Sequence, residues 1–398
     1  MNGEQIRIAE LGKIVTGKTP STGNASFFEG DYLFVTPSDL DWESYYCRTT
    51  ERTVSGEAKR AYNNQFIPPD SVMVTCIGNT LGKCGISSDE CLTNQQINSI
   101  IPTAGVSPKF VYYLMLFNKE VIRGIGLGGG SATPILNKTD FSNTKIQVPP
   151  RKSWETIATI LSAYDDLIEN NRRRIQLLEN AARLLYKEWF VNLRFPGHEH
   201  VRIKNGVPEG WKREKLGEVV SINKETLPSN FQGEIEYVDI SSVVTGHIQN
   251  TTMYPFQEAP GRARRVVMHG DVIWSCVRPN RRSYAVIWSP PDNLIVSTGF
   301  AVLTPLRLPT SYLYQATTTD EFVGHLTNSA RGVAYPAVTA KDFENAEVVV
   351  PDSQLLANYN DMCEPVLKQI AVLSDQNKTL KKARAILLPR LMNGDISV

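Results

Sequence analysis

The sequence predicts an α+β protein that is built twice, with two β-rich domains separated by two long helices that form an antiparallel coiled coil. Three observations support this fold: an internal repeat, short strand-like runs in two regions, and a heptad pattern after each region. The expected domains are residues 1–148 and 197–350, and the expected helices are residues 149–196 and 351–398. A pseudo-two-fold axis is expected to relate the two halves.

The internal repeat is clearest around two prolines, Pro134 and Pro336, which align at an offset of 202. The same offset places Asp140 on Asp342. Chance similarity between β-rich stretches is the alternative, and the constant offset from Pro134 to beyond Pro149 argues against it. Looser matches occur earlier in the chain: Leu11-Gly12 with Leu216-Gly217, and Val72–Cys76 with Val272–Cys276.

The two β-rich regions consist of short apolar runs separated by Gly, Pro, Asn and Asp. Examples are Tyr32–Val35 in the first region and Tyr284–Trp288 in the second. One helix is expected in each region, from Pro108 to about Ile122 and from about Ser311 to Leu326.

The segment from Arg151 to Phe195 contains neither Gly nor Pro, and its a and d heptad positions are almost all apolar. Adding 202 carries the same pattern to the C-terminal region. There, Pro365 and Pro389 are expected to interrupt the helix and to leave only Val366–Leu388 regular. The expected seam residues are Leu161, Ile168, Asn171, Ile175, Leu178 and Leu185 in the first helix, and Ile370, Leu373, Asn377, Leu380 and Leu387 in the second.

The two asparagines of the seam suggest a register for the helix pair. If Asn171 faces Asn377, each buried amide satisfies the other within one layer. Ile168 then lies opposite Leu380 in this register.

The composition is that of a folded chain with little net charge. Hydrophobic residues make up 41% and charged residues 21%, and 42 Lys and Arg against 41 Asp and Glu give a net charge of +1. This excludes a uniformly basic or acidic protein but allows local basic surfaces. We expect a cytoplasmic protein with no membrane partner, because no apolar run could span a bilayer and the start of the sequence lacks a signal-peptide pattern. The six cysteines include no C-x-x-C pair, and no metal site is expected.

The segment Ile157–Asn171, with Leu178-Glu179 and Lys187–Val191 after it, closely resembles the central conserved region of DNA-specificity subunits in type I restriction–modification systems. Thr93–Asn98 and Leu387–Gly394 are also similar to patterns of that family. The resemblance covers nearly the whole chain. It implies two target-recognition domains, each of which reads half of a split DNA sequence, and a helix pair that serves as the spacer between them.

The resemblance also implies the partners: double-stranded DNA, two methyltransferase subunits, and restriction–translocase subunits that join through the complex. Adenine methylation with S-adenosylmethionine is then the work of the partner, so neither a cofactor nor a catalytic residue is expected in this chain. The residues agree, because no Asn/Asp-Pro-Pro-aromatic motif is present and Gly126–Gly130 lacks the strand-to-helix context of a cofactor loop.

Two other classes of protein remain as alternatives. An autonomous DNA-modifying enzyme would itself bind S-adenosylmethionine. A coiled-coil scaffold without nucleic acid would show no salt-sensitive binding of DNA.

The basic residues of the second domain are the clearest candidates for DNA contact. Arginine can bind phosphate and can form a bidentate pair with guanine, whereas a solvated surface turn is the alternative. The candidates are Arg262, Arg264, Arg265, Arg278, Arg281, Arg282, Tyr284, Arg331 and Tyr335.

The first domain offers amides and hydroxyls instead. Asn94-Gln95-Gln96 could read adenine or could stabilise the fold. Arg172-Arg173-Arg174 on the helix could contact phosphate or form a solvated face. The candidates in this domain are Lys18, Thr19, Ser21, Thr22, Asn24, Asn79, Thr80, Lys83, Gln95, Gln96 and Ser131.

Overall fold

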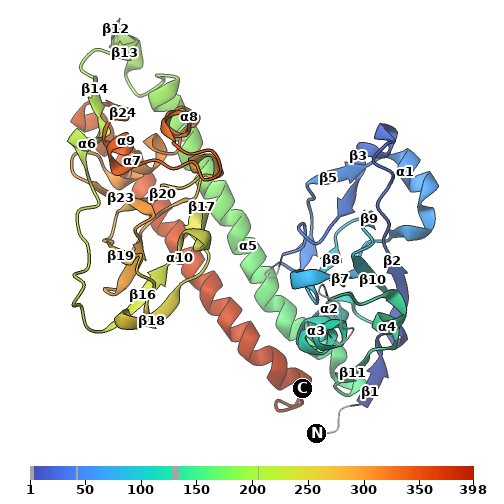
Figure 1. Ribbon diagram of the computed structural model, residues 1–398. Coiled ribbons are helices and arrows are strands. Elements are labelled where there is room, and N and C mark those ends of the chain that lie inside the picture. The colour runs from blue at the N-terminus through green and yellow to red at the C-terminus, as the bar shows by residue number, and fades with distance from the viewer. Residues whose placement is uncertain (1–3, 42–43, 128–133, 205) are drawn as a thin grey trace. The chain divides into compact units, whose positions relative to one another are not determined.

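The computed structural model describes residues 4–41, 44–127, 134–204 and 206–398. The chain forms two compact units. Unit 1 comprises Met1–Arg173 and Asp375–Val398, and unit 2 comprises Arg174–Ser374. Each unit therefore contains one β-rich region together with a part of each long helix (Figure 1).

Unit 1 is built on a five-stranded sheet in the order β2-β10-β7-β8-β4 and a four-stranded sheet in the order β5-β3-β9-β6. A third pairing joins the first strand of the unit, β1, to its last, β11. The central strand β7 is buried along its whole length, as its Val-Met-Val-Thr sequence favours. The strands are β1 (Glu4–Arg7), β2 (Gly12–Thr16), β3 (Phe28–Val35), β4 (Tyr46–Cys47), β5 (Arg52–Val54), β6 (Phe66–Ile67), β7 (Val72–Thr75), β8 (Cys84–Ser87), β9 (Cys91–Thr93), β10 (Ile97–Pro102) and β11 (Lys145–Val148).

Unit 2 repeats this topology. Its sheets have the orders β15-β23-β20-β21-β17 and β18-β16-β22-β19, and β14 pairs with β24. Each of these pairings keeps the direction of its counterpart, including the parallel pairs β17–β21 and β4–β8. The short pair β12–β13 of unit 2 has no counterpart among the described strands of unit 1. The internal repeat expected from the sequence is confirmed. The strands are β12 (Ile203–Lys204), β13 (Val207–Pro208), β14 (Lys212–Lys215), β15 (Val220–Ile222), β16 (Glu234–Val238), β17 (Val243–Ile248), β18 (Thr252–Pro255), β19 (Ala263–Val266), β20 (Val272–Ser275), β21 (Tyr284–Val286), β22 (Leu294–Ser297), β23 (Phe300–Pro305) and β24 (Glu347–Val350).

The single helix expected in each β-rich region is wrong, because two helices lie at each place. In unit 1 these are α2 (Pro108–Phe117) and α3 (Lys119–Leu127), and in unit 2 they are α7 (Thr310–Ala316) and α8 (Asp320–Ser329). Side chains that bind backbone groups separate them: Asn118 Nδ2 donates to the Leu114 carbonyl, and Thr319 Oγ1 accepts from the Phe322 N–H. The shorter helices are α1 (Gly56–Ala61), α4 (Lys138–Asn143), α6 (Leu216–Val219) and α9 (Ala340–Glu344).

The two long helices are α5 (Trp154–Tyr186), which continues as a π-helical turn over Lys187–Val191, and α10 (Ser353–Met392). The interruption expected in α10 is wrong, since the helix runs unbroken through Pro365 and Pro389. Both prolines are exposed, as are the residues four positions earlier whose carbonyls lose an N–H partner. Water can therefore satisfy those carbonyls. Within the described residues, no helix is both long enough and apolar enough to cross a membrane.

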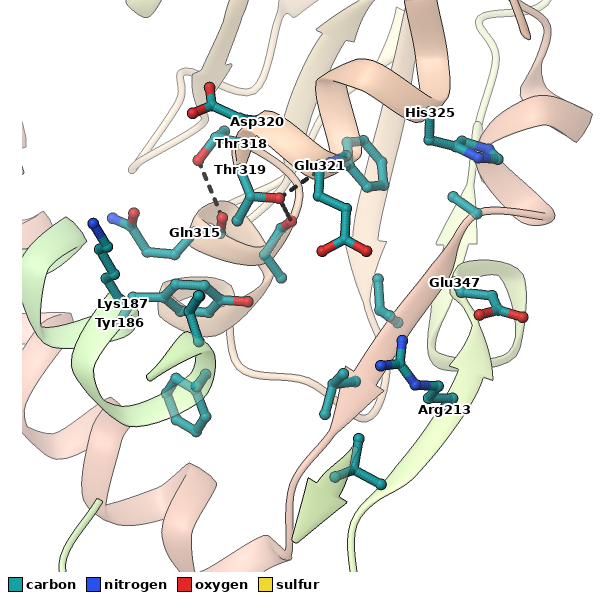
Figure 2. Close-up of a pocket in the computed structure, with 18 of the residues that line it drawn as sticks. Tyr186, Lys187, Arg213, Gln315, Thr318, Thr319, Asp320, Glu321, His325 and Glu347 are labelled. Carbon is teal, nitrogen blue, oxygen red and sulfur yellow. Dashed lines mark hydrogen bonds between the residues drawn. The ribbon is translucent and has the colours of Figure 1, made fainter. Parts of the chain in front are cut away.

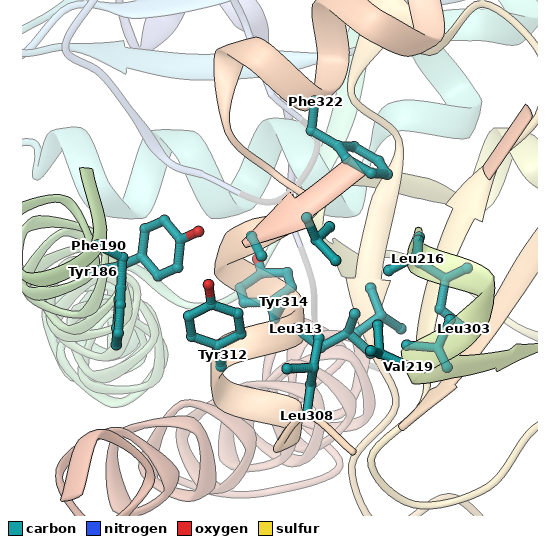
Figure 3. Close-up of a cluster of buried hydrophobic side chains, with 14 of the residues drawn as sticks. Tyr186, Phe190, Leu216, Val219, Leu303, Leu308, Tyr312, Leu313, Tyr314 and Phe322 are labelled. Atoms are coloured by element: carbon teal, nitrogen blue, oxygen red, sulfur yellow. The ribbon is translucent and has the colours of Figure 1, made fainter. Parts of the chain in front are cut away.

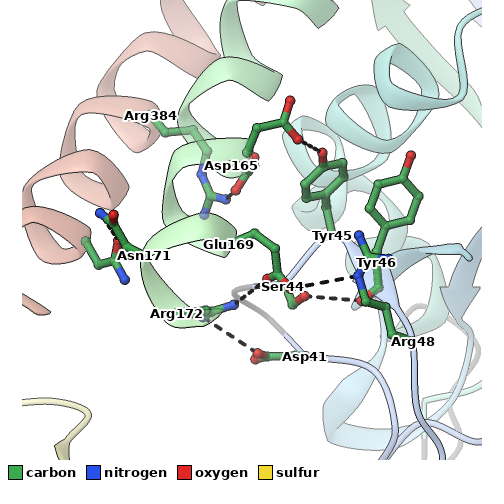
Figure 4. A network of polar contacts seen from close by, with 12 residues as sticks. Asp41, Ser44, Tyr45, Tyr46, Arg48, Asp165, Glu169, Asn171, Arg172 and Arg384 are labelled. Carbon is green, nitrogen blue, oxygen red and sulfur yellow. Dashed lines mark hydrogen bonds and ion pairs between the residues drawn. The ribbon is translucent and has the colours of Figure 1, made fainter. Parts of the chain in front are cut away.

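Within unit 1, the parts of α5 and α10 run antiparallel. Asn171 Nδ2 donates to Asn377 Oδ1 over 3.1 Å, which is the register expected from the sequence. Arg384 forms an ion pair with Asp165 (Figure 4). Asp165 precedes Asn171 in α5, whereas Arg384 follows Asn377 in α10, as an antiparallel pair of helices requires. Of the expected seam residues, Leu161, Ile168, Asn171, Leu373 and Asn377 are buried, and Ile175, Leu178, Leu185, Ile370, Leu380 and Leu387 are partly buried.

The helix parts of unit 2 pack through aromatic rings. Phe190 lies 4.8 Å from Tyr312 and 5.0 Å from Tyr359, measured between ring centroids. Figure 3 shows Tyr186 and Phe190 of the α5 end facing Tyr312 of α7. This aromatic cluster joins both long helices to the sheet side of unit 2.

Candidate nucleic-acid interface

The turn between β20 and β21 carries three of the candidate arginines. It is a short 3₁₀ turn, Pro279–Arg281, flanked by Arg278 and Arg282. The Arg278 N–H donates to the Pro336 carbonyl over 2.7 Å, and the Val338 N–H donates to the Cys276 carbonyl over 2.9 Å. These backbone bonds attach the turn to the loop of residues 331–338, so two separate candidate segments form one surface.

The Arg278 side chain is held at this surface by two contacts. Its guanidinium lies 4.6 Å from the centroid of the Tyr335 ring, and its Nη2 donates to the Ala334 carbonyl over 3.2 Å. Tyr335 is itself 71% exposed. Stacking on an aromatic face orients the planar guanidinium, because the cation is attracted to the ring quadrupole.

The backbone of this turn is unusual for arginine. Arg278 has φ 51° and Arg282 has φ 56°, both in the left-handed region that disfavours residues with a Cβ. The matching turn of unit 1 lies between β7 and β8 and has Gly78 at φ 63° and Gly82 at φ 87°. The Gly78 N–H donates to the Pro134 carbonyl, as the Arg278 N–H does to Pro336. Unit 2 therefore has arginines at two positions whose backbone favours glycine.

Arg282 points to a different partner from Arg278. It forms an ion pair with Asp320, the first residue of α8, and its hydrogen bond lowers the pKa of that carboxyl. Asp320 also lines a cavity of about 870 Å³ in unit 2 (Figure 2). The labelled charged side chains of this cavity are of both signs: Lys187, Arg213, Asp320, Glu321 and Glu347. Such mixed charge does not favour a nucleic acid, whose phosphates attract cations alone.

The other candidate arginines of unit 2 differ in exposure. Arg262 and Arg281 are exposed. Arg264 stacks on Phe256 at 4.5 Å, and Arg265 Nη1 donates to Thr226 Oγ1 over 3.1 Å, so both are partly buried by protein. Arg331 is exposed, and its guanidinium nitrogen lies 3.9 Å from an Asp342 oxygen.

The expectation that Tyr284 contacts DNA is wrong. Its side chain is 1% exposed and packs against Trp274 at 4.7 Å between ring centroids. Tyr284 begins β21, and alternation along the strand turns this residue toward the core of unit 2.

In unit 1, candidate residues from two loops meet. The Lys18 N–H donates to the Thr93 carbonyl over 2.8 Å, and Thr19 Oγ1 donates to Gln95 Oε1 over 2.6 Å. Lys18, Ser21, Thr22 and Gln95 are exposed. Asn24, also exposed, caps the 3₁₀ turn Ala25–Phe27 by accepting from the Ser26 N–H.

The residues of the tripeptide Asn94-Gln95-Gln96 differ in role: some stabilise the fold, and one is placed where it could contact a base. Asn94 is buried, and its Oδ1 accepts from the Gln96 N–H over 3.0 Å, so this pair shapes the turn. Gln95 alone of the three is exposed. Asn79 is exposed on the turn that contains Gly78, while Thr80 and Lys83 are partly buried and hydrogen-bond to backbone carbonyls. Ser131 lies outside the described residues.

The arginines of the central helix are not equivalent. Arg172 lies 3.9 Å from an Asp41 oxygen and 4.0 Å from a Glu169 oxygen, so it belongs to a polar network inside unit 1 (Figure 4). Arg173 and Arg174 are exposed. Across the described ranges, no three His, Cys, Asp or Glu side chains gather as a metal ion would require.

Sequence reasoning missed the special backbone of the β20–β21 turn and the ion pair of Arg282 with Asp320. A signal for the first was present. Aligning the two halves at an offset of 200 sets Gly78 against Arg278 and Gly82 against Arg282, and a glycine at both places points to left-handed backbone.

Comparison with known proteins matches residues 2–180 to the type I restriction modification DNA specificity domain, and the similarity to one specificity subunit extends over 98% of the chain. Residues 2–180 belong to the family of type I restriction modification DNA specificity domains, and the resemblance of the chain to type I specificity subunits is confirmed. That relative is the MjaIX specificity subunit of Methanocaldococcus jannaschii, with 25% identity and 93% of its own length covered. The HindI specificity subunit of Haemophilus influenzae is 34% identical over 42% of this chain and 38% of its own length.

A solved structure supports the fold of the whole chain. The S subunit of the type I system from M. genitalium has a TM-score of 0.59 with 16% identity, and the alignment covers 98% of this chain and 96% of that one. The architecture expected from the sequence is therefore confirmed. The expectation that this chain is a recognition subunit agrees with the DNA specificity domain that it matches and with the specificity-subunit name of its relative.

Proposed function

We propose that this specificity subunit reads a bipartite double-stranded DNA target, with the β-rich region of each unit reading one half-site. The observation that carries the proposal is the repeated topology with different surface chemistry. The turn between β7 and β8 of unit 1 has glycines, whereas the matching turn between β20 and β21 of unit 2 has arginines. Two copies of one framework with different side chains suit the reading of two different sequences.

The chemistry of the two surfaces supports different preferences. In unit 2, Arg278, Arg281 and Arg262 offer guanidinium groups, which pair with phosphate and with guanine. In unit 1, Thr19 and Gln95 offer a hydroxyl and an amide, and an amide can pair with adenine. The two half-sites are therefore proposed to differ in sequence.

We further propose that the subunit assembles with two methyltransferase subunits, one for each copy of the repeat. The partner would bind S-adenosylmethionine and methylate adenine, and restriction–translocase subunits would join through the complex. The repeat supports this, because each unit presents the same order of sheets beside a part of each long helix.

The test is to produce the full chain together with its methyltransferase subunit and to map methylated adenines in genomic DNA. A split motif with an unspecified spacer is expected. An unbroken motif, or the same methylation without this chain, would contradict the proposal.

Two binding measurements address the other classes of protein. Affinity of the full chain for a DNA duplex should fall steeply with salt, because phosphate contacts release counterions. Binding of S-adenosylmethionine by the chain alone would instead support an autonomous modifying enzyme.

A further inference from the structure

We infer that Arg278 determines specificity in unit 2 by reading a guanine of its half-site. The inference rests on the proposed function and adds to it the residue and the base. It begins from the backbone of the β20–β21 turn, where an arginine adopts a conformation that glycine adopts without strain.

The fold itself does not need an arginine at this position. Unit 1 makes the same turn with Gly78, which forms the same backbone hydrogen bond to the loop that follows the α-helices. When a residue with a side chain occupies a strained backbone position that glycine could occupy without strain, that side chain is expected to have a function. Arg282 shares the strain, and its ion pair with Asp320 accounts for it by tying the turn to α8.

The guanidinium of Arg278 is arranged for recognition. The Tyr335 ring fixes its plane, and the bond to the Ala334 carbonyl uses one of the five N–H donors that a guanidinium carries. The remaining edge of the fork has the geometry that matches O6 and N7 of guanine in the major groove. An arginine held in advance loses less conformational freedom on binding, which favours discrimination.

The surroundings suit a DNA duplex. Arg281 in the same turn is exposed, and so are Arg331 and Tyr335 of the loop joined to it. Arg281 and Arg331 place additional positive charge beside Arg278, where phosphates would flank a base contact.

The decisive variant is Arg278→Gly in the full chain, produced with the methyltransferase subunit. Glycine keeps the turn, as Gly78 does in unit 1, so the folded structure should be retained, and a thermal unfolding measurement checks this. Mapping of methylated adenines should then show one G·C position of a single half-site become degenerate. Discrimination at that position should fall by about tenfold to a hundredfold, the range for one bidentate arginine–guanine pair.

Arg281→Ala is the matched control from the same turn. As a phosphate contact, Arg281 should weaken binding to all duplexes alike and reduce the salt slope by about one, with the motif unchanged. If Arg278→Gly behaves in the same way, Arg278 contacts only the backbone and the inference is overturned.

The wild-type motif separates the two levels of proposal. A split motif that Arg278→Gly leaves unchanged overturns the inference alone. A wild-type chain that directs no split motif overturns the proposed function, and the inference with it.

Discussion

Units 1 and 2 share one topology and both pack apolar side chains against the long helices, but each adds contacts of a different kind. Unit 1 adds buried polar contacts to this packing: Arg384 pairs with Asp165 (Figure 4). Asp165 also accepts a 2.5 Å hydrogen bond from the Tyr113 hydroxyl. Unit 2 uses the aromatic cluster that includes Tyr312 and Tyr359. The apolar pattern and the strand order thus define the repeated fold. The side chains that contact the long helices differ between the two units without changing that fold.

The polar solution of unit 1 has a cost that the aromatic one avoids. Burial raises the pKa of Asp165 even though the adjacent Arg384 favours its charged form. Desolvating a carboxylate and a guanidinium offsets much of their attraction, so such a pair contributes to specificity of packing more than to net stability.

The largest effect is expected from Arg384→Leu. The substitution leaves the Asp165 carboxyl, whose side chain is 1% exposed, without its cationic partner. Unit 1 should lose about 3–5 kcal/mol of unfolding free energy, measured by denaturant titration. The double variant Asp165→Leu with Arg384→Leu should recover most of this loss, and a single variant as stable as the wild type would show that the pair is not buried in solution.

Asn171→Leu should have the next largest effect. It removes the partner of the buried Asn377 amide and should cost about 1–3 kcal/mol. Replacing both asparagines with leucine should restore stability but loosen the register of the helix pair. Cysteine cross-linking between α5 and α10 would measure the register, and an unchanged single register in the double variant would contradict the role given to the asparagines.

Gly78→Arg tests whether the turn of unit 1 accepts the residue of unit 2. No heavy atom lies within 4 Å of a Cβ added there, so only the left-handed backbone opposes the change, at about 1–2 kcal/mol. Thermal unfolding should show a small loss of stability with the fold retained. Gly12→Ala is the contrast: its Cβ would lie 2.0 Å from the Ile101 carbonyl oxygen, so it should destabilise unit 1 more than Gly78→Arg does.

The smallest effect concerns the caps of two matching helices. Thr339 caps α9 in unit 2, and Asn137 caps α4 in unit 1. Loss of either cap by substitution with alanine should cost about 1 kcal/mol in its own unit. Hydrogen bonds from Thr339 lower the pKa of Asp342 below its usual value near 4.

The lowered pKa of Asp342 sets the direction of a pH dependence. Its contribution to stability is present above the unfolded pKa and is lost as the pH falls through the lower folded pKa. Thr339→Ala should therefore reduce the acid sensitivity of unit 2, measured as unfolding free energy between pH 6 and about pH 3. Equal acid sensitivity in the variant and the wild type would contradict this.

The sequence predicted what depends on regular periodicity. The repeat, the presence of a long helix after each β-rich region and the pairing of Asn171 with Asn377 all follow from patterns that recur along the chain. The failures depend on which way a residue faces. Pro365 is tolerated because it lies on an exposed helix face, and Tyr284 is buried because of its place on β21.

The candidate site was predicted less completely than the fold. Residues such as Lys18, Gln95 and Arg278 were identified by type, and the structure leaves Lys18 and Gln95 exposed and Arg278 in a surface turn. Their groupings were not predicted, because loops meet through backbone hydrogen bonds between segments far apart in sequence. The bond from the Arg278 N–H to the Pro336 carbonyl is one example.

The shared turn of the two units also bears on how such a protein can change over generations. Its path is set by backbone hydrogen bonds and persists with glycine or with arginine at the same place. A codon change there alters one surface group and leaves the scaffold intact. The binding preference of one unit can therefore change while that of the other is kept, and each variant along the way can still fold.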